Sequence, residues 1–252
     1  MTAIKYHIDA IRITFEQLFK GNFLLFFLPG IIVTIAYLIQ KLTALNIQDS
    51  VQLNECGAWY GFIKDWFNSG VRLFFSVFHF FLDQIYIFIV LTALSPFNTR
   101  LGEKLDEELT GNISESSFIR LISDVIRMVF VVLIALILQL LIVGFYSLIV
   151  YTFGLPEVVN TVIHFMIQAF FFGFTFYDFC LERNKRGVFY TLGFSFSRPL
   201  AMVITGSIFL GIYAIPYVGI ILAPVLCLMI STVAYLYYTQ ALPTINNLQS
   251  NE

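Results

Sequence analysis

Residues 199–240 read PLAMVITGSIFLGIYAIPYVGIILAPVLCLMISTVAYLYYTQ, and this stretch decides the fold. It belongs to a run without Asp, Glu, Lys or Arg that follows Arg198 and continues to Glu252. An apolar run of this length must fold back on itself. We predict the turn at residues 215–219, IPYVG, because proline removes a backbone donor and glycine permits the chain to reverse.

The composition of the whole chain indicates the same environment. Of its 252 residues, 59% are hydrophobic and 12% are charged, whereas soluble domains carry about 25% charged residues. The chain also contains 29 Phe, more rings than a soluble protein of this size has room to bury. We therefore predict an all-α integral membrane protein whose main partner is the lipid bilayer.

Six segments approach the roughly 20 apolar residues that a membrane-spanning helix needs. They are residues 23–39, 71–94, 128–153, 158–177, 199–214 and 220–240. A helix over 199–214 would be only about 24 Å long, shorter than a hydrocarbon core of about 30 Å. The segment 23–39 is also short and contains Pro29. We therefore expect about six membrane-inserted segments, some of them hairpins that penetrate only half of the bilayer.

We expect a single membrane domain over residues 1–252. The apolar residues of 1–22 recur every three to four positions, which predicts an amphipathic helix in the membrane interface. The expected parts are an interfacial amphipathic helix 1–22, a first membrane helix 23–41, an outer connection 42–70, a second membrane helix 71–95, a cytoplasmic loop with an amphipathic helix 96–127, a helical hairpin 128–178, a basic cytoplasmic loop 179–198, a C-terminal hairpin 199–241 and a tail 242–252.

The Lys and Arg residues predict the orientation, because cytoplasmic loops carry an excess of them. With six insertions, eleven of the fourteen Lys and Arg fall on the side of the N-terminus. We therefore expect both termini in the cytoplasm. The net charge of −2 argues against nucleic acid as a partner, since phosphate binding needs concentrated positive charge.

Two polar residues stand near the middle of the expected second membrane helix. His79 precedes Asp83 by four residues, which places them on one helix face. An intramembrane carboxylate is costly and needs a partner. Either the pair lines a permeation path or forms part of a proton relay, or it is a buried pair that holds helices together. No enzyme motif is present, so we expect no enzyme, no metal and no cofactor.

Several stretches, in this order and spacing, resemble the CysZ family, which also includes the eukaryotic etoposide-induced proteins. The residues that carry the resemblance are Ser95-Pro96-Phe97-Asn98 with Leu101, Glu103, Lys104, Glu107 and Gly111; Tyr177-Asp178 with Arg186-Gly187-Val188-Phe189; Leu192-Gly193-Phe194; Ile215-Pro216; Ala223-Pro224; and Ala234-Tyr235-Leu236. The resemblance implies a bacterial inner-membrane protein that forms oligomers. It also implies a channel-like uptake of sulfate for cysteine synthesis, without ATP.

The chain departs from the family at one motif. The family's sulfate site lies near a Gly-Leu-Arg sequence about eight residues before a proline. Here Gly21 stands eight residues before Pro29, but Asn22 and Phe23 follow it. Lys20 is the nearest cation, and it lacks the bidentate fork of an arginine.

The leading hypothesis is a passive inner-membrane transporter or channel for a small anion, sulfate-like by resemblance. Basic side chains at the inner mouth would concentrate anions there, although the same loops must be basic for reasons of topology. The candidate anion-binding residues are Lys20, Gly21, Arg100, Lys104, Arg183 and Arg186. The alternative is a structural or accessory subunit of a larger membrane complex, without transport of its own.

Overall fold

The computed structural model describes residues 2–35, 38–39, 90–92, 94–111, 118–184 and 186–242. Within these ranges the chain is helical and contains no strand, so the all-α prediction is confirmed. The expected outer connection, most of the helix expected over 71–94, and the pair His79 and Asp83 lie outside the described residues. The described elements are α1 (Thr2–Phe19), η1 (Leu24–Phe27), α4 (Ser95–Thr110), α5 (Phe118–Phe153), α6 (Glu157–Arg183), α7 (Val188–Ser197), α8 (Pro199–Tyr213) and α9 (Val218–Tyr238).

Three of these helices are long and apolar enough to cross a membrane, namely α6, α9 and the part Ile126–Val150 of α5. Two further spans are possible if each bent pair of helices counts as one. Helix α1 and the helical segment Leu24–Ile35 meet at 103°, and α7 and α8 meet at 96°. The described residues therefore provide three to five candidate spans, and the six expected insertions go beyond what they contain.

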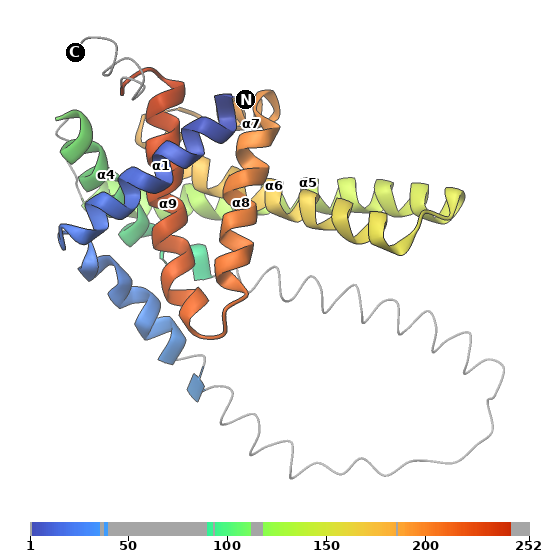
Figure 1. The fold of residues 1–252 in the computed structure, drawn as a ribbon, viewed down its shortest axis with the longest axis horizontal. Coiled ribbons are helices and arrows are strands. Elements are labelled where there is room, and N and C mark those ends of the chain that lie inside the picture. Colours follow the sequence, from blue (N-terminus) through green and yellow to red (C-terminus); the bar gives the residue numbers. More distant parts are fainter. Residues whose placement is uncertain are drawn as a thin grey trace.

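Helix α9 occupies the centre of the molecule. Of the residues in the most apolar part of α9, 83% are buried within the protein, whereas in the most apolar part of α5 the share is 28%. Helices α1, α4, α6 and α8 all pack against it. Figure 1 shows α8 and α9 running side by side, while α5 and α6 extend together away from them. The outer part of the α5–α6 pair consequently exposes large apolar side chains, such as Phe145 (68% exposed) and Val158 (75%).

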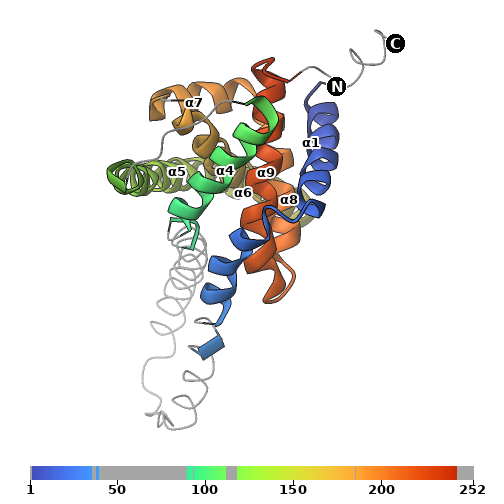
Figure 2. The same ribbon diagram turned by 90° about the vertical axis from the view of Figure 1, so that its left-hand side faces the viewer.

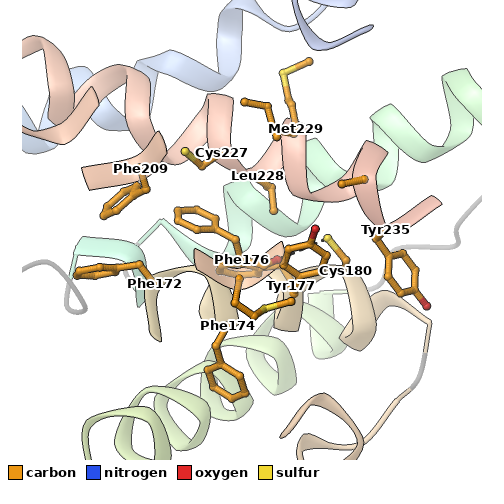
Figure 3. Close-up of a cluster of buried hydrophobic side chains, with 14 of the residues drawn as sticks. Phe172, Phe174, Phe176, Tyr177, Cys180, Phe209, Cys227, Leu228, Met229 and Tyr235 are labelled. Carbon is orange, nitrogen blue, oxygen red and sulfur yellow. Dashed lines mark hydrogen bonds between the residues drawn. The ribbon is translucent and has the colours of Figure 1, made fainter. Parts of the chain in front are cut away.

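An aromatic cluster joins the central helices (Figure 3). The Phe209 ring of α8 lies 4.9 Å from the Phe172 ring and 5.1 Å from the Phe176 ring of α6, measured between centroids. The three rings are fully buried. Ring pairs at this separation contribute roughly 0.5–1.5 kcal/mol each beyond the area they bury.

Helices α6 and α8 cross with their backbones in contact. A Cβ atom added at Gly206 of α8 would overlap the backbone of Ala169, and one added at Gly173 of α6 would overlap the backbone of Met202. Ala169 and Gly173 are four residues apart, which is the small-xxx-small spacing that lets apolar helices approach closely. This contact is the most extensive between any two described elements.

The turn predicted at residues 215–219 is present between α8 and α9. Its left-handed residue is Tyr217, with a φ of 62°. Gly219 has a different role from the one its sequence position suggests. A side chain at Gly219 would press against the carbonyl oxygens of Ile212 and Tyr213, so this glycine lets the end of α8 lie close to the start of α9.

Two helix boundaries differ from the expected ones. The basic loop expected over 179–198 is mostly helical, because α6 continues to Arg183 and α7 follows at Val188. The amphipathic helix expected before residue 128 is the beginning of α5, which runs through 36 residues without a break. No proline or glycine interrupts residues 118–143, so hydrogen bonding continues from the polar part of the helix into its apolar part.

Helix α1 packs through a face of small and uncharged polar residues, while Arg12 and Glu16 are exposed. Its buried residues are His7, Ala10, Thr14 and Gln17, whereas Ile8 (61% exposed) and Phe19 (86%) point away from the protein. A hydrogen bond of 2.9 Å joins His7 Nε2 to Thr205 Oγ1 of α8, and Nδ1 lies 2.7 Å from the carbonyl oxygen of Ala3. The small and polar side of α1 therefore contacts the bundle, with Ile11 and Leu18 packed beside it, and Ile4, Ile8, Phe15 and Phe19 are exposed.

Candidate functional site

The site is built on α4, whose ends the sequence defines. Pro96 stands in the first turn, where a missing N–H costs no helical bond. Gly111 ends the helix with a φ of 75°, and its N–H donates to the Glu107 carbonyl. Figure 2 shows α4 crossing the bundle near α6 and α9, both of which it contacts.

One face of α4 carries a stripe of small and polar residues that we call the inner stripe. Its members follow one another at intervals of three to four residues, which aligns them on one side of a helix. The inner stripe consists of Ser95, Asn98, Gly102 and Asp106. Ser95 and Asn98 are buried, and Asp106 Oδ1 accepts a hydrogen bond of 3.1 Å from Thr110 Oγ1.

Arg183, at the end of α6, lies against the inner stripe. Its side chain is only 6% exposed, and Nε stands 3.2 Å from Asp106 Oδ2. A Cβ atom at Gly102 would be 2.7 Å from Arg183 Nη1, so the guanidinium fits there because residue 102 has no side chain. Thr232 of α9 lines the same place, with its hydroxyl near Gly102.

The guanidinium of Arg183 is incompletely hydrogen-bonded. Nε and Nη2 are buried and have no hydrogen-bond partner among the described residues. The Nε contact with Asp106 is close enough for charge pairing but does not have the geometry of a hydrogen bond. On α4, Asn98 Nδ2 and the hydroxyls of Ser95 and Thr99 are likewise buried without a partner. Buried donors in native proteins are normally satisfied, so this group has the chemistry to accept a ligand with several oxygen atoms.

A second buried ion pair stands on α6, one and a half turns before Arg183. Arg127 Nη2 of α5 lies 2.9 Å from Asp178 Oδ1, and Thr191 Oγ1 of α7 donates to the same oxygen at 2.8 Å. Arg127 Nη1 also donates to the carbonyl oxygen of Arg186, at 2.6 Å. The carboxylate of Asp178 therefore ties three helices together, and its hydrogen bonds identify it as structural.

Three of the predicted anion-binding residues meet at the bend after α1. Lys104 Nζ of α4 donates to the carbonyl oxygen of Asn22 at 2.6 Å and lies 5.2 Å from the centroid of the Phe23 ring. Gly21 has a φ of 80°, and its N–H donates to the Leu18 carbonyl. Lys20 is exposed beside it. Gly21 thus ends α1 and Lys104 fastens the bend, which accounts for both without an anion.

The remaining predicted residues lie apart from one another. Arg100 Nη1 is 4.0 Å from Glu103 Oε2 on the same helix. The Arg186 guanidinium lies over the Tyr190 ring, 4.9 Å from its centroid. Arg183 contacts the face of α4 opposite to Lys104, because positions 102 and 104 are separated by about 200° around a helix. The six predicted residues do not form one site, and Arg183 is the member that is both buried and incompletely paired.

The partners of Arg183 and Arg127 were absent from the predicted site. A signal for Asp178 was available, since it is the only carboxylate of α6 between Glu157 and Glu182, and a carboxylate in an apolar helix requires a partner. Nothing in the sequence distinguished Asp106 from the neighbouring acidic residues of α4. Its role follows from its position on the same face as Gly102.

Within the described ranges, no three His, Cys, Asp or Glu side chains come together as metal ligands would. No family model matches this sequence, and no curated protein matches it. The fold and the site define an all-helical protein with apolar helices of membrane-spanning length and a buried guanidinium between α4 and α6. The resemblance to the CysZ family stays a prediction.

Proposed function

We propose that this chain is a passive transporter or channel for a small oxyanion of the sulfate class, and that Arg183 binds the anion. The observation that carries the proposal is the state of the Arg183 side chain, which is buried while Nε and Nη2 lack hydrogen-bond partners in the part of the chain that the structure describes. A guanidinium presents its donors in a fixed fork that matches an oxyanion, and hydrogen bonds to a charged acceptor are roughly twice as strong as neutral ones.

The surroundings of Arg183 favour an oxyanion over other ligands. The unpartnered groups that α4 carries among the described residues are an amide nitrogen and two hydroxyls, which can all donate hydrogen bonds. Sulfate carries only acceptors and would satisfy several of them at once. The position of Asn98, one helical turn from Gly102, puts its side chain on the same face of α4 as the guanidinium.

Asp106 limits how tightly an anion is held. Its carboxylate pairs with Arg183 and would compete with a bound anion for the same cation. Conduction requires binding that is strong enough to admit the ion and weak enough to release it. A site of one cation partly neutralised by one carboxylate meets this condition better than an unopposed cation does.

The test is a flux measurement on purified full-length protein in liposomes with labelled sulfate. The wild-type protein should raise sulfate flux above that of empty liposomes, and Arg183→Gln should lower this flux about tenfold or more, since glutamine lacks the charge. Arg12→Gln is the matched control, because Arg12 is exposed and pairs with Glu16 at 2.9 Å. Its flux should equal that of the wild type.

A second variant separates a lost site from a misfolded protein. Asp106→Asn keeps the cation and removes its competitor, so half-maximal flux should occur at a lower sulfate concentration. If wild-type flux equals that of empty liposomes for sulfate and other oxyanions, the transport proposal is overturned in favour of the accessory role. If Arg183→Gln is monodisperse and transports like the wild type, Arg183 is not the binding residue.

A further inference from the structure

The outer side of α7 carries a hollow bounded by aromatic rings and a cation. Its volume is about 400 Å³. It is lined by Phe189, Tyr190, Gly193, Phe194, Ser197 and Arg198. Phe189, Gly193 and Ser197 follow one another at intervals of four, so one row of the helix begins with a large ring and continues with two positions that are nearly empty. The hollow is the space that those two positions leave.

Aromatic rings hold the cation of this hollow in place. The Arg198 guanidinium lies 4.4 Å from the centroid of the Phe194 ring and 5.4 Å from that of the Tyr238 ring. Its Nη1 donates to Ser197 Oγ at 3.2 Å. Contacts of this kind are attractive and orient the guanidinium, while most of its five N–H groups remain available to a further acceptor.

A second cation stands at the beginning of the same helix. Arg186 lies over the Tyr190 ring, 4.9 Å from its centroid. Among the described residues, no carboxylate comes within ion-pair distance of Arg186 or Arg198. The hollow therefore has Arg198 in its lining and Arg186 beside its Tyr190 wall, and neither charge is neutralised by the part of the chain that the structure describes.

The rim of the hollow is apolar and exposed. Phe189 is 86% exposed and Phe196 is 51% exposed. In water, two exposed phenylalanines beside two arginines would be an unfavourable surface. At the bilayer interface the same group of side chains is favourable, because aromatic rings lie at headgroup level and basic side chains meet lipid phosphate groups.

We infer that the hollow on α7 binds the headgroup of an anionic phospholipid, with its phosphate at Arg198, with Arg186 as a second cation on the same surface, and with its acyl chains along Phe189 and Phe196. Charge complementarity selects an anionic headgroup, and the exposed rings select a lipid over a free phosphate ion, which would leave Phe189 uncovered. This inference concerns a different surface from the α4–α6 site and does not depend on the proposed function.

The test measures the thermal stability of the full chain in a neutral detergent with added lipid. A ligand that binds only the folded state raises the melting temperature. Phosphatidylglycerol should raise it by about 5 °C, phosphatidylcholine should raise it by less than half as much, and inorganic phosphate should leave it unchanged. The double variant Arg186→Gln/Arg198→Gln should lose the rise.

A steric variant keeps the test decisive if the double variant fails to fold. Gly193→Leu leaves both cations in place and fills the hollow, since a Cβ at Gly193 meets no atom within 4 Å. It should fold without lipid and lose the response to phosphatidylglycerol. Gly144→Leu is the matched control on α5, where the space is also open, and it should keep the response. A full response in Gly193→Leu, an equal response to phosphatidylcholine, or an equal response to inorganic phosphate would each overturn the inference.

Discussion

Replacing Gly206 by alanine is expected to prevent α6 and α8 from packing as they do here. The added methyl group would overlap the backbone of Ala169. Backbone atoms cannot rotate out of the way as a side chain can, so the two helices must separate along their whole contact. This contact is the most extensive one in the bundle, and overlap of this kind costs more than about 3 kcal/mol.

The result is measured as the yield of monodisperse protein in detergent and as the melting temperature of what remains. Gly211→Ala on the same helix is the control, because a Cβ there meets no atom within 4 Å. Alanine is favoured over glycine within a helix by up to about 1 kcal/mol, so this variant should be as stable as the wild type or more so. Equal stability of the Gly206 and Gly211 variants would contradict the crossing described here.

The second large effect is expected at Asp178. Asp178→Asn removes the negative charge that pairs with Arg127 and weakens the acceptor for Thr191. The Asp178 side chain is 3% exposed and that of Arg127 is 20% exposed. Breaking a buried pair by removing one partner costs about 3–5 kcal/mol. We expect the lower end of this range, because Arg127 can turn partly toward water, and a fall in melting temperature of about 6–12 °C.

A double-mutant cycle separates the interaction energy of Arg127 with Asp178 from the cost of losing the buried carboxylate alone. Arg127→Gln with Asp178→Asn should cost clearly less than the sum of the two single changes. The matched pair is Arg12 and Glu16, which lie at the same separation of 2.9 Å but are exposed. Their cycle should give a coupling below about 1 kcal/mol. Additive effects for Arg127 and Asp178 would show that the two groups do not interact.

Composition and hydropathy were enough to predict helices of membrane-spanning length. They also placed the reversal between α8 and α9, since Pro216 and Gly219 interrupt an otherwise continuous apolar run. The bends of 103° and 96° could not be predicted. A glycine or proline marks where a helix ends, but the direction of the next helix depends on the surfaces it packs against.

Helix α1 shows why a pattern of faces did not predict the packing. Its periodicity predicted an apolar face with Ile8 and Phe15 and a charged face with Arg12 and Glu16, whereas the buried face lies beside both and carries His7, Ala10, Thr14 and Gln17. In a soluble protein the apolar face would be buried, but lipid is as apolar as the side chains themselves and gives no drive to bury them. Hydrogen bonding decides instead, and His7 turns inward to reach Thr205.

The sequence predicted only part of the candidate site, because tertiary packing decides which side chains meet. Counting cations along the chain selected Arg183 and Lys104, and the resemblance to the CysZ family added Gly21. The structure engages Lys104 and Gly21 at the bend after α1. What distinguishes Arg183 is its contact with Gly102 and Asp106, which are remote from it in the sequence. Such pairings depend on the tertiary arrangement, and no local sequence pattern predicts them.

The central place of α9 has a consequence for biosynthesis. All the helices that surround it, α1, α4, α6 and α8, precede it in the chain, so a growing polypeptide lacks the central helix until these four have been synthesised. We expect close contacts such as that of α6 with α8 to form first and α9 to pack against them later. Ribosome-bound intermediates that stop before α9 should therefore be recognised by membrane proteases far more readily than the finished chain.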